Sequence, residues 1–191
     1  MVNRNPLVTN QLQTLAHQRY AYRHAEVMDS LPVPPDVDLA SDRYQANCGP
    51  VAFAAALGLS VLEVISNFPQ FPQRPWTNLQ SMTKALDRLR VPWEINEKTL
   101  PGCGLALIQW EGPWMRSRTT ALRYTHWVAV YDEYFFDINW PGWLPQPIWE
   151  QMIVPQFIEF EPRITGWAVS LSVGISGQAD RSWPRPATRP L

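Results

Sequence analysis

The sequence predicts an α+β protein in which helices dominate the first half and strands the second. Up to about residue 90, helix-capping patterns precede apolar stretches with helical spacing. From residue 91 onward, the apolar segments are short and have the length of strands. A chain of 191 residues suits a single core. We therefore expect one domain over residues 36–175, an N-terminal helical arm over residues 1–35 and a disordered tail over residues 176–191.

Residues 6–29 carry scattered Leu and Tyr among Gln, Arg and His, which predicts a loosely amphipathic helix. The proline-rich segment that begins at Leu31 ends it. A helix packed outside the core is the favoured interpretation of this arm. A docking element, or a segment that covers a cleft, is the alternative.

The next helix is predicted over about residues 49–57. Pro50 suits a first helical turn because its missing N–H would have no partner there, and small apolar residues follow it. Two capping-box patterns then predict two more helices, and they are formed by Ser60 with Glu63 and by Thr77 with Gln80. The second of these helices has an apolar face made of Leu79, Met82, Leu86 and Leu89.

Five apolar segments are predicted as strands: residues 91–95, 105–110, 127–131, 134–138 and 167–173. The last alternates large apolar residues with small or polar ones, as a half-buried strand does. A short helix is expected near residues 148–153. The resulting picture is a set of N-terminal helices packed against an antiparallel sheet.

Composition excludes several classes of function. The formal net charge is −1, so no strong field attracts nucleic acid or an anionic membrane. No apolar run could span a membrane and the N-terminus lacks the core of a signal peptide, so we expect a cytoplasmic protein, with delivery to another cell or host left open. Three histidines and two distant cysteines lack metal-ligand spacing, so neither a metal nor a cofactor is expected. The oligomeric state stays open.

Cys48 is the candidate nucleophile, because the motif Asn47-Cys48-Gly49-Pro50 places it where a helix begins. The positive end of the helix dipole lowers the pKa of a thiol there. Gly49 is expected to let a substrate backbone approach closely. For a cysteine taken alone, burial as a small apolar residue is the plainer interpretation. Cys103, between two glycines, is expected in a turn, and both cysteines are treated as thiols.

His126 opens the apolar strand at residues 127–131, and a tight turn at residues 132–133 would bring the next strand back beside it. A two-residue turn places Asn139 opposite His126, with Asp137 diagonal to it on the same face. An amide or carboxylate there would orient the imidazole. We prefer Asn139 as this third member, and Asp137 is the alternative if the register shifts by two.

The oxyanion hole is expected to use the backbone N–H of Cys48 and a nearby side-chain amide. Gln45 is the first candidate and Asn47 the second, although both could simply cap the turn. Four tryptophans flank the proposed catalytic strands, where they could line a cleft or pack in the core; they are Trp110, Trp114, Trp140 and Trp143.

A Cys-Gly-Pro helix start, a strand histidine and a later acid or amide resemble the papain-like cysteine peptidase superfamily. The resemblance covers about residues 42–142. The segments 47–50, 79–89, 105–110 and 126–130 are most similar to bacteriocin-leader-processing peptidase domains. Residues 126–127 together with residues 135–139 are also similar to Josephin deubiquitinases. Papain-like sites have a glutamine a few residues before the cysteine, where this chain has Asp42 and Arg43.

This resemblance implies a papain-like fold in which a central Cys-bearing helix packs against the sheet that carries the histidine and the Asn or Asp. It implies a cysteine peptidase that hydrolyses a peptide or isopeptide bond of a protein or peptide substrate. Two alternatives stay open. One is a transglutaminase or deamidase that uses the same residues, and the other is an inactive, Trp-rich protein-binding module.

Overall fold

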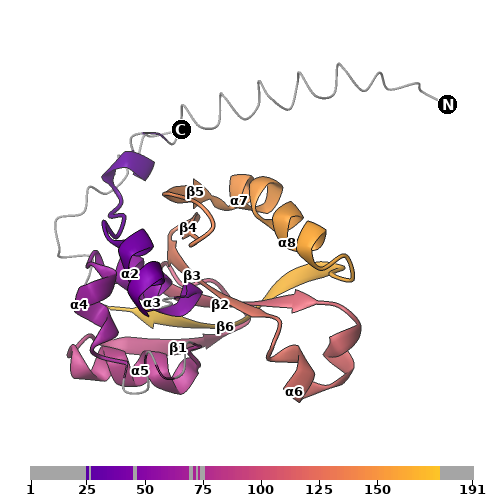
Figure 1. Cartoon of the computed structure of the whole chain (residues 1–191), viewed down its shortest axis with the longest axis horizontal. Helices are drawn as coiled ribbons and strands as arrows, with labels where there is room; N and C mark the ends of the chain where they lie inside the picture. The colour runs from indigo at the N-terminus through magenta and orange to yellow at the C-terminus, as the bar shows by residue number, and fades with distance from the viewer. Residues whose placement is uncertain are drawn as a thin grey trace.

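The computed structural model describes residues 25, 27–44, 47–68, 71, 73 and 76–176. Its centre is a six-stranded sheet with the order β1-β6-β2-β3-β4-β5 (Figure 1). All neighbouring strands are antiparallel. The strands are β1 (Trp93–Glu97), β2 (Cys103–Glu111), β3 (Thr125–Tyr131), β4 (Tyr134–Phe136), β5 (Trp143–Pro145) and β6 (Gly166–Ile175).

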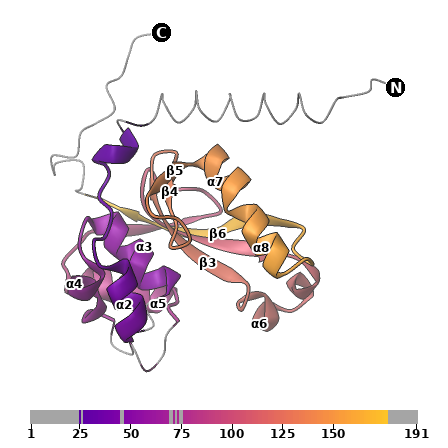
Figure 2. The same ribbon diagram turned by 45° about the horizontal axis from the view of Figure 1, so that its top comes forward.

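Helices cover both faces of this sheet, so the molecule has an α+β architecture (Figure 2). On one face lie α2 (Val37–Tyr44), α3 (Cys48–Leu57), α4 (Val61–Ile65) and α5 (Leu79–Arg88). On the other lie the 3-10 helix η1 (Pro113–Arg116), α6 (Arg118–Ala121), α7 (Gln146–Met152) and α8 (Val154–Phe160).

The strand side chains divide between the two layers by simple alternation. In β3, Trp127 and Ala129 pack beneath α3, whereas Val128 and Val130 pack beneath the α7 layer. Burial on both faces explains why β2 and β3 read as nearly continuous apolar runs.

The central helix α3 begins at Cys48, one residue before its predicted start. Its N-cap is Asn47, whose side-chain oxygen accepts the N–H of Gly49 at 3.2 Å. The helix ends at Leu57, and its C-cap Gly58 takes the left-handed conformation with φ 64°. Every residue after the first is buried, so the sheet and the neighbouring helices fix α3 on all sides.

The two capping-box predictions have different outcomes. Ser60 and Glu63 form the predicted box at the start of α4. The box at α5 lies one position later than predicted, because Asn78 and Ser81 form it instead of Thr77 and Gln80. Thr77 has a tertiary role, since its carbonyl oxygen accepts the indole N–H of Trp127 at 3.3 Å.

All five predicted strands are present, although their first or last residues differ from the predicted ones. The three-residue strand β5 was not predicted. The helix expected near residues 148–153 is the pair α7 and α8. Cys103 is the first residue of β2, so the expectation of a turn there is wrong.

Most of the predicted N-terminal arm and of the tail lies outside the described residues. The described end of the arm contacts the domain: Leu31 is buried in the core, and the carbonyl oxygen of Pro32 accepts the indole N–H of Trp143 at 2.8 Å. Asp36 accepts the N–H groups of Val61 and Leu62 and so ties this segment to α4. Within the described part of the chain, no helix has the length and apolar character to cross a membrane.

Candidate active site

The candidate site lies at a free edge of β3. The short strand β4 pairs only with residues 129–131, and the register is the predicted one, with Tyr131 opposite Tyr134. β3 begins at Thr125, so its first residues have β2 on one side and no β4 partner on the other. Backbone groups at this edge are therefore available to other elements.

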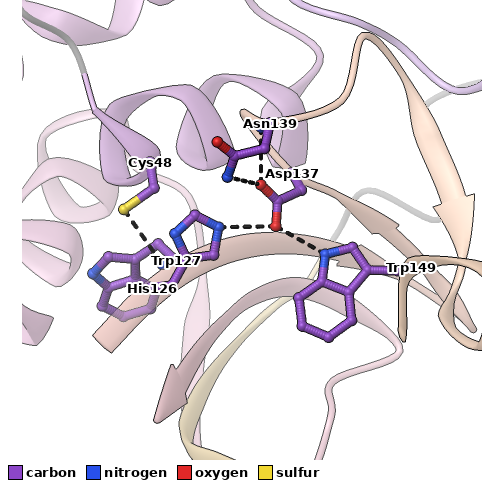
Figure 3. A network of polar contacts seen from close by, with 6 residues as sticks. All are labelled: Cys48, His126, Trp127, Asp137, Asn139 and Trp149. Carbon is purple, nitrogen blue, oxygen red and sulfur yellow. Dashed lines mark hydrogen bonds and ion pairs between the residues drawn. The ribbon is translucent and has the colours of Figure 1, made fainter. Parts of the chain in front are cut away.

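The thiol of Cys48 occupies that edge. The backbone N–H of Trp127 donates to Cys48 Sγ at 3.5 Å (Figure 3). In an antiparallel strand alternate residues direct their N–H groups to the same neighbour, and Trp127 continues the series of Tyr131 and Ala129, which face β4. Where β4 has ended, the sulfur accepts the hydrogen bond. Residues 79 positions apart in the chain thus meet at the start of α3.

His126 lies beside this thiol and is only 6% exposed. Its Nε2 contacts Asp137 Oδ2 at 2.9 Å, and its other ring nitrogen lies on the side of Cys48 (Figure 3). The thiol and the imidazole are close enough for each to shift the pKa of the other. The ring of Phe157 from α8 packs against the imidazole at a centroid distance of 5.1 Å.

Asp137 is 1% exposed, and four hydrogen bonds satisfy its carboxylate. Oδ2 contacts His126 Nε2 and accepts the indole N–H of Trp149 at 2.8 Å. Oδ1 accepts the backbone N–H of Asn139 at 3.0 Å and its side-chain N–H at 2.8 Å. A buried carboxylate needs such partners to stay ionised.

The expectation that Asn139 lies opposite His126 is wrong. The register is as predicted, but β4 ends at Phe136 and residues 137–140 turn away, with the N–H of Trp140 donating to the Asp137 carbonyl oxygen at 3.0 Å. Asn139 consequently contacts the Asp137 carboxylate instead of the imidazole. Asp137 reaches His126 from this turn without any shift of register, and it does so from outside the sheet.

The charges of the three residues are coupled. Burial raises the pKa of the Cys48 thiol, but the imidazolium of His126, its hydrogen bond and the N–H of Trp127 together bring that pKa below its ordinary value. Burial lowers the pKa of His126, yet Asp137 and Cys48 raise it to about 10. Burial raises the pKa of Asp137, and His126, Asn139 and Trp149 bring it below its usual range. All three shifts favour the charged forms, which are a thiolate, an imidazolium and a carboxylate.

Cys103 provides a contrast within the same chain. Burial and the nearby Asp132 carboxylate raise the pKa of its thiol to about 11. No disulfide joins Cys48 and Cys103. The pKa of Cys48 is therefore shifted down and that of Cys103 is shifted up.

The residues expected around an oxyanion hole have different outcomes. Gln45 lies outside the described residues. Asn47 caps α3, and the N–H of Cys48 lies in the first helical turn, where backbone N–H groups have no intrahelical acceptor. Gly49 is buried, and a Cβ there would lie 1.7 Å from Thr77 Oγ1. Gly49 therefore serves packing against Thr77, and the expected approach of a substrate backbone to it is wrong.

Most of the tryptophans expected to line a cleft belong to the core. Trp110, Trp114 and Trp143 are buried. Trp140 alone of the four lines a surface hollow of about 340 Å³, together with Asn139 and a proline-rich wall. This hollow adjoins the turn that carries Asp137.

Sequence reasoning missed Trp149, which is 0% exposed and contacts the candidate site directly. The available signal was its position in a short apolar segment expected to be helical, because a buried tryptophan needs an acceptor for its indole N–H. Nothing in the sequence identified Asp137 as that acceptor. Across the described residues, no group of three or more His, Cys, Asp or Glu side chains could hold a metal ion.

No family model matches the chain, and comparisons with the curated proteins and with the solved structures found no significant match. The function is therefore inferred from the geometry and chemistry of the site itself.

Proposed function

We propose that this protein is a cysteine peptidase that hydrolyses a peptide or isopeptide bond through Cys48, His126 and Asp137. The observation that supports it best is the placement of the Cys48 thiol beside the His126 imidazole, whose Nε2 in turn contacts the Asp137 carboxylate at 2.9 Å. A nucleophile, a base beside it and a group that orients the base are the three parts that thiol acyl transfer needs.

In the acylation step, the Cys48 thiolate attacks the substrate carbonyl carbon and forms a carbon–sulfur bond. The carbon–nitrogen bond then breaks, and the His126 imidazolium gives its proton to the leaving amine. Asp137 stabilises the imidazolium before this transfer and holds the ring in one tautomer afterwards. The N–H of Cys48 is the first candidate donor to the developing oxyanion, and Gln45 stays a prediction for the second.

In the deacylation step, His126, now neutral, takes a proton from water as the water oxygen attacks the thioester carbonyl. The carbon–sulfur bond breaks, and the thiolate and imidazolium are regenerated together with a carboxylic acid product. If an amine attacked instead of water, the same thioester would lead to transamidation. Hydrolysis is the simpler proposal, because water requires no second binding site.

We also propose that the fold is papain-like. The support is the central helix α3, which carries Cys48 at its first turn and packs against the antiparallel strands β2 and β3, with His126 on β3. The order along the chain, cysteine, then histidine, then the acid, is the order of the papain-like peptidases that the sequence resembles. A departure is that Asp137 and Asn139 lie in a turn beyond β4.

A reactive probe tests this proposal. The protein is treated at neutral pH with two thiol-reactive probes, each of which carries an electrophile at the position of the scissile carbonyl. One probe is built on ubiquitin and the other on a peptide ending in Gly-Gly. Intact mass and peptide mapping are then measured. We expect a single adduct on Cys48 that persists in Cys103→Ala and is lost in folded Cys48→Ala. Products from the matching amide substrates would separate hydrolysis from transamidation by mass.

A Cys48 thiol that is no more reactive than Cys103 toward either electrophile, and toward iodoacetamide, would overturn the proposal. The inactive binding module would then be the better description.

A further inference from the structure

Trp149 meets the site from an element that contains none of the proposed catalytic residues. It lies in α7, and its indole N–H donates to Asp137 Oδ2 at 2.8 Å, the same oxygen that contacts His126 Nε2 at 2.9 Å. Two N–H groups from different elements therefore converge on one carboxylate oxygen (Figure 3).

The direction of this indole N–H is fixed by packing. Phe135 and Trp167 contact the Trp149 ring edge-on at centroid distances of 5.1 Å and 5.2 Å. Trp110 stacks on it at 6.1 Å. With 0% exposure, the ring has no space to rotate and no water to bind instead of the carboxylate.

The two sides of the Asp137 carboxylate are held differently. Asn139 binds Oδ1, but it is exposed and only two residues away, so it belongs to the same turn. Trp149 binds Oδ2 from a separate helix, and so it restrains the turn relative to the sheet. Rotation of the carboxylate away from this orientation would weaken its contact with His126, because hydrogen bonds weaken steeply once their angle falls below about 120°.

We infer that Trp149 is a positioning residue, whose indole N–H holds Asp137 Oδ2 in place for His126 and thereby sustains the charged pair of Cys48 and His126. The inference rests on the proposed function, since it assigns a role within the same site. Such a residue contacts no reacting atom and acts through Asp137.

The charged groups that act on Asp137 belong to the site itself. The titratable groups that face it are His126 from β3 and Cys48 from α3. α7 contributes the neutral indole, because its charged residue Glu150 accepts a hydrogen bond from Gln146 instead. α8 contributes the neutral ring of Phe157, which lies against His126.

The test compares Trp149→Phe with Trp143→Phe. Both variants remove one indole N–H bond of 2.8 Å and keep an aromatic ring, but the Trp143 bond ends on the Pro32 carbonyl oxygen and not on Asp137. The measurement is the rate of Cys48 alkylation by iodoacetamide across pH, followed by peptide mass spectrometry. It needs no substrate.

We expect Trp149→Phe to move the acid limb of the Cys48 alkylation rate to higher pH by about one unit. The loss of one hydrogen bond to a charged group changes an ionisation equilibrium by about that amount. Both the loss of a donor to the carboxylate and the loosened imidazole act in this direction. Trp143→Phe is expected to leave the limb in place. A limb that stays, moves down, or moves equally in both variants would overturn the inference.

A second measurement uses the wild-type protein, in case Trp149→Phe does not fold. The indole N–H resonance of Trp149, assigned through its own side-chain correlations, is expected to shift with the same midpoint as Cys48 alkylation. A resonance that is insensitive to pH contradicts the inference. If wild-type Cys48 is itself no more reactive than Cys103, the proposed function fails, which is a result distinct from either of these.

Discussion

Asp137 lies between His126 and Asn139 and contacts both, so that its Oδ2 meets the imidazole at 2.9 Å while its Oδ1 accepts the Asn139 side chain at 2.8 Å. The carboxylate is therefore the group that touches the imidazole, and the amide supports the carboxylate. This order assigns the two residues different expected effects on the site.

Replacing Asp137 is expected to harm the site far more than replacing Asn139. Asp137→Asn removes the negative charge that stabilises the imidazolium, so both Cys48 alkylation at pH 7 and hydrolysis of a fluorogenic Gly-Gly peptide should fall, the latter by about 10²- to 10⁴-fold. Asn139→Ala leaves the charge and is expected to lower hydrolysis by less than about tenfold, as the loss of one supporting hydrogen bond does. Equal losses, or a larger loss for Asn139→Ala, would contradict the assignment.

The part of this arrangement that is local in sequence was predictable. The turn at residues 132–133 fixes the register of β3 with β4, and Asp132 takes the positive φ of 50° that a tight two-residue hairpin turn requires. The alternation along β3 likewise separated His126 from Trp127. Both follow from spacing alone.

The end of β4 was not predictable, because distant residues determine it. Phe136 is followed by residues that continue a strand-like alternation, and no Gly or Pro interrupts it before residue 141. The chain leaves the sheet at Asp137, where the carboxylate binds the indole of Trp149 and the imidazole of His126. These bonds join residues 11 and 12 positions apart on separate elements, and such contacts leave no periodic signal in the sequence. A strand that continued to residue 139 would place Asn139 opposite His126, and the sequence alone therefore favours Asn139.

The same limit explains the error at α5. Thr77 and Asn78 are both acceptable N-caps, and Gln80 and Ser81 are both able to bond back. Contact of Thr77 with Gly49 and Trp127 selects the later of the two starts. Local capping rules predicted a helix there, and tertiary packing decided its first residue.

The stability of the protein should depend on pH through the Cys48 and His126 pair. His126 has its pKa raised from 6.5 to about 10, so its stabilisation is complete below pH 6.5 and is lost as pH rises through about 10. Cys48 has its pKa lowered from 9.0, so its stabilisation is complete above pH 9.0 and is lost as pH falls through the lowered pKa.

Together the two shifts predict a plateau. At pH values above both 6.5 and the lowered pKa of Cys48, and below 9.0, the folded pair is a thiolate with an imidazolium and the unfolded pair is a thiol with a neutral imidazole, so both states hold one proton and the pair adds no slope. In Cys48→Ala the folded imidazolium has no such compensation. Its free energy of unfolding, measured in urea across pH, should begin to fall above pH 6.5. Parallel curves for wild type and Cys48→Ala would contradict the charged pair.

Gly49→Ala is expected to destabilise the protein through a clash with Thr77. The new Cβ would lie 1.7 Å from Thr77 Oγ1 and 2.9 Å from Thr77 Cβ, so Thr77 must move away from α3. Overpacking of this kind costs about 1–3 kcal/mol. Thr77→Ala removes the hydroxyl, which has no hydrogen-bond partner within the described part of the chain. Urea unfolding should show that Gly49→Ala costs less in the Thr77→Ala background, and additive effects would mean that Thr77 is not the obstacle.

Asn47 is expected to act as a helix cap and not as an oxyanion donor. Its side-chain oxygen accepts the N–H of Gly49, and Asn78 caps α5 in the same way through the N–H of Ser81 at 2.9 Å, far from the site in sequence. Asn47→Ala and Asn78→Ala should therefore each lower the free energy of unfolding by about 1 kcal/mol, as the loss of an N-cap does. If capping is the whole role of Asn47, hydrolysis of a Gly-Gly peptide by the folded fraction of Asn47→Ala should fall by less than about tenfold. The loss of an oxyanion donor would instead lower hydrolysis by about 10²- to 10³-fold with no matching change in Asn78→Ala, and that result would transfer Asn47 to the catalytic machinery.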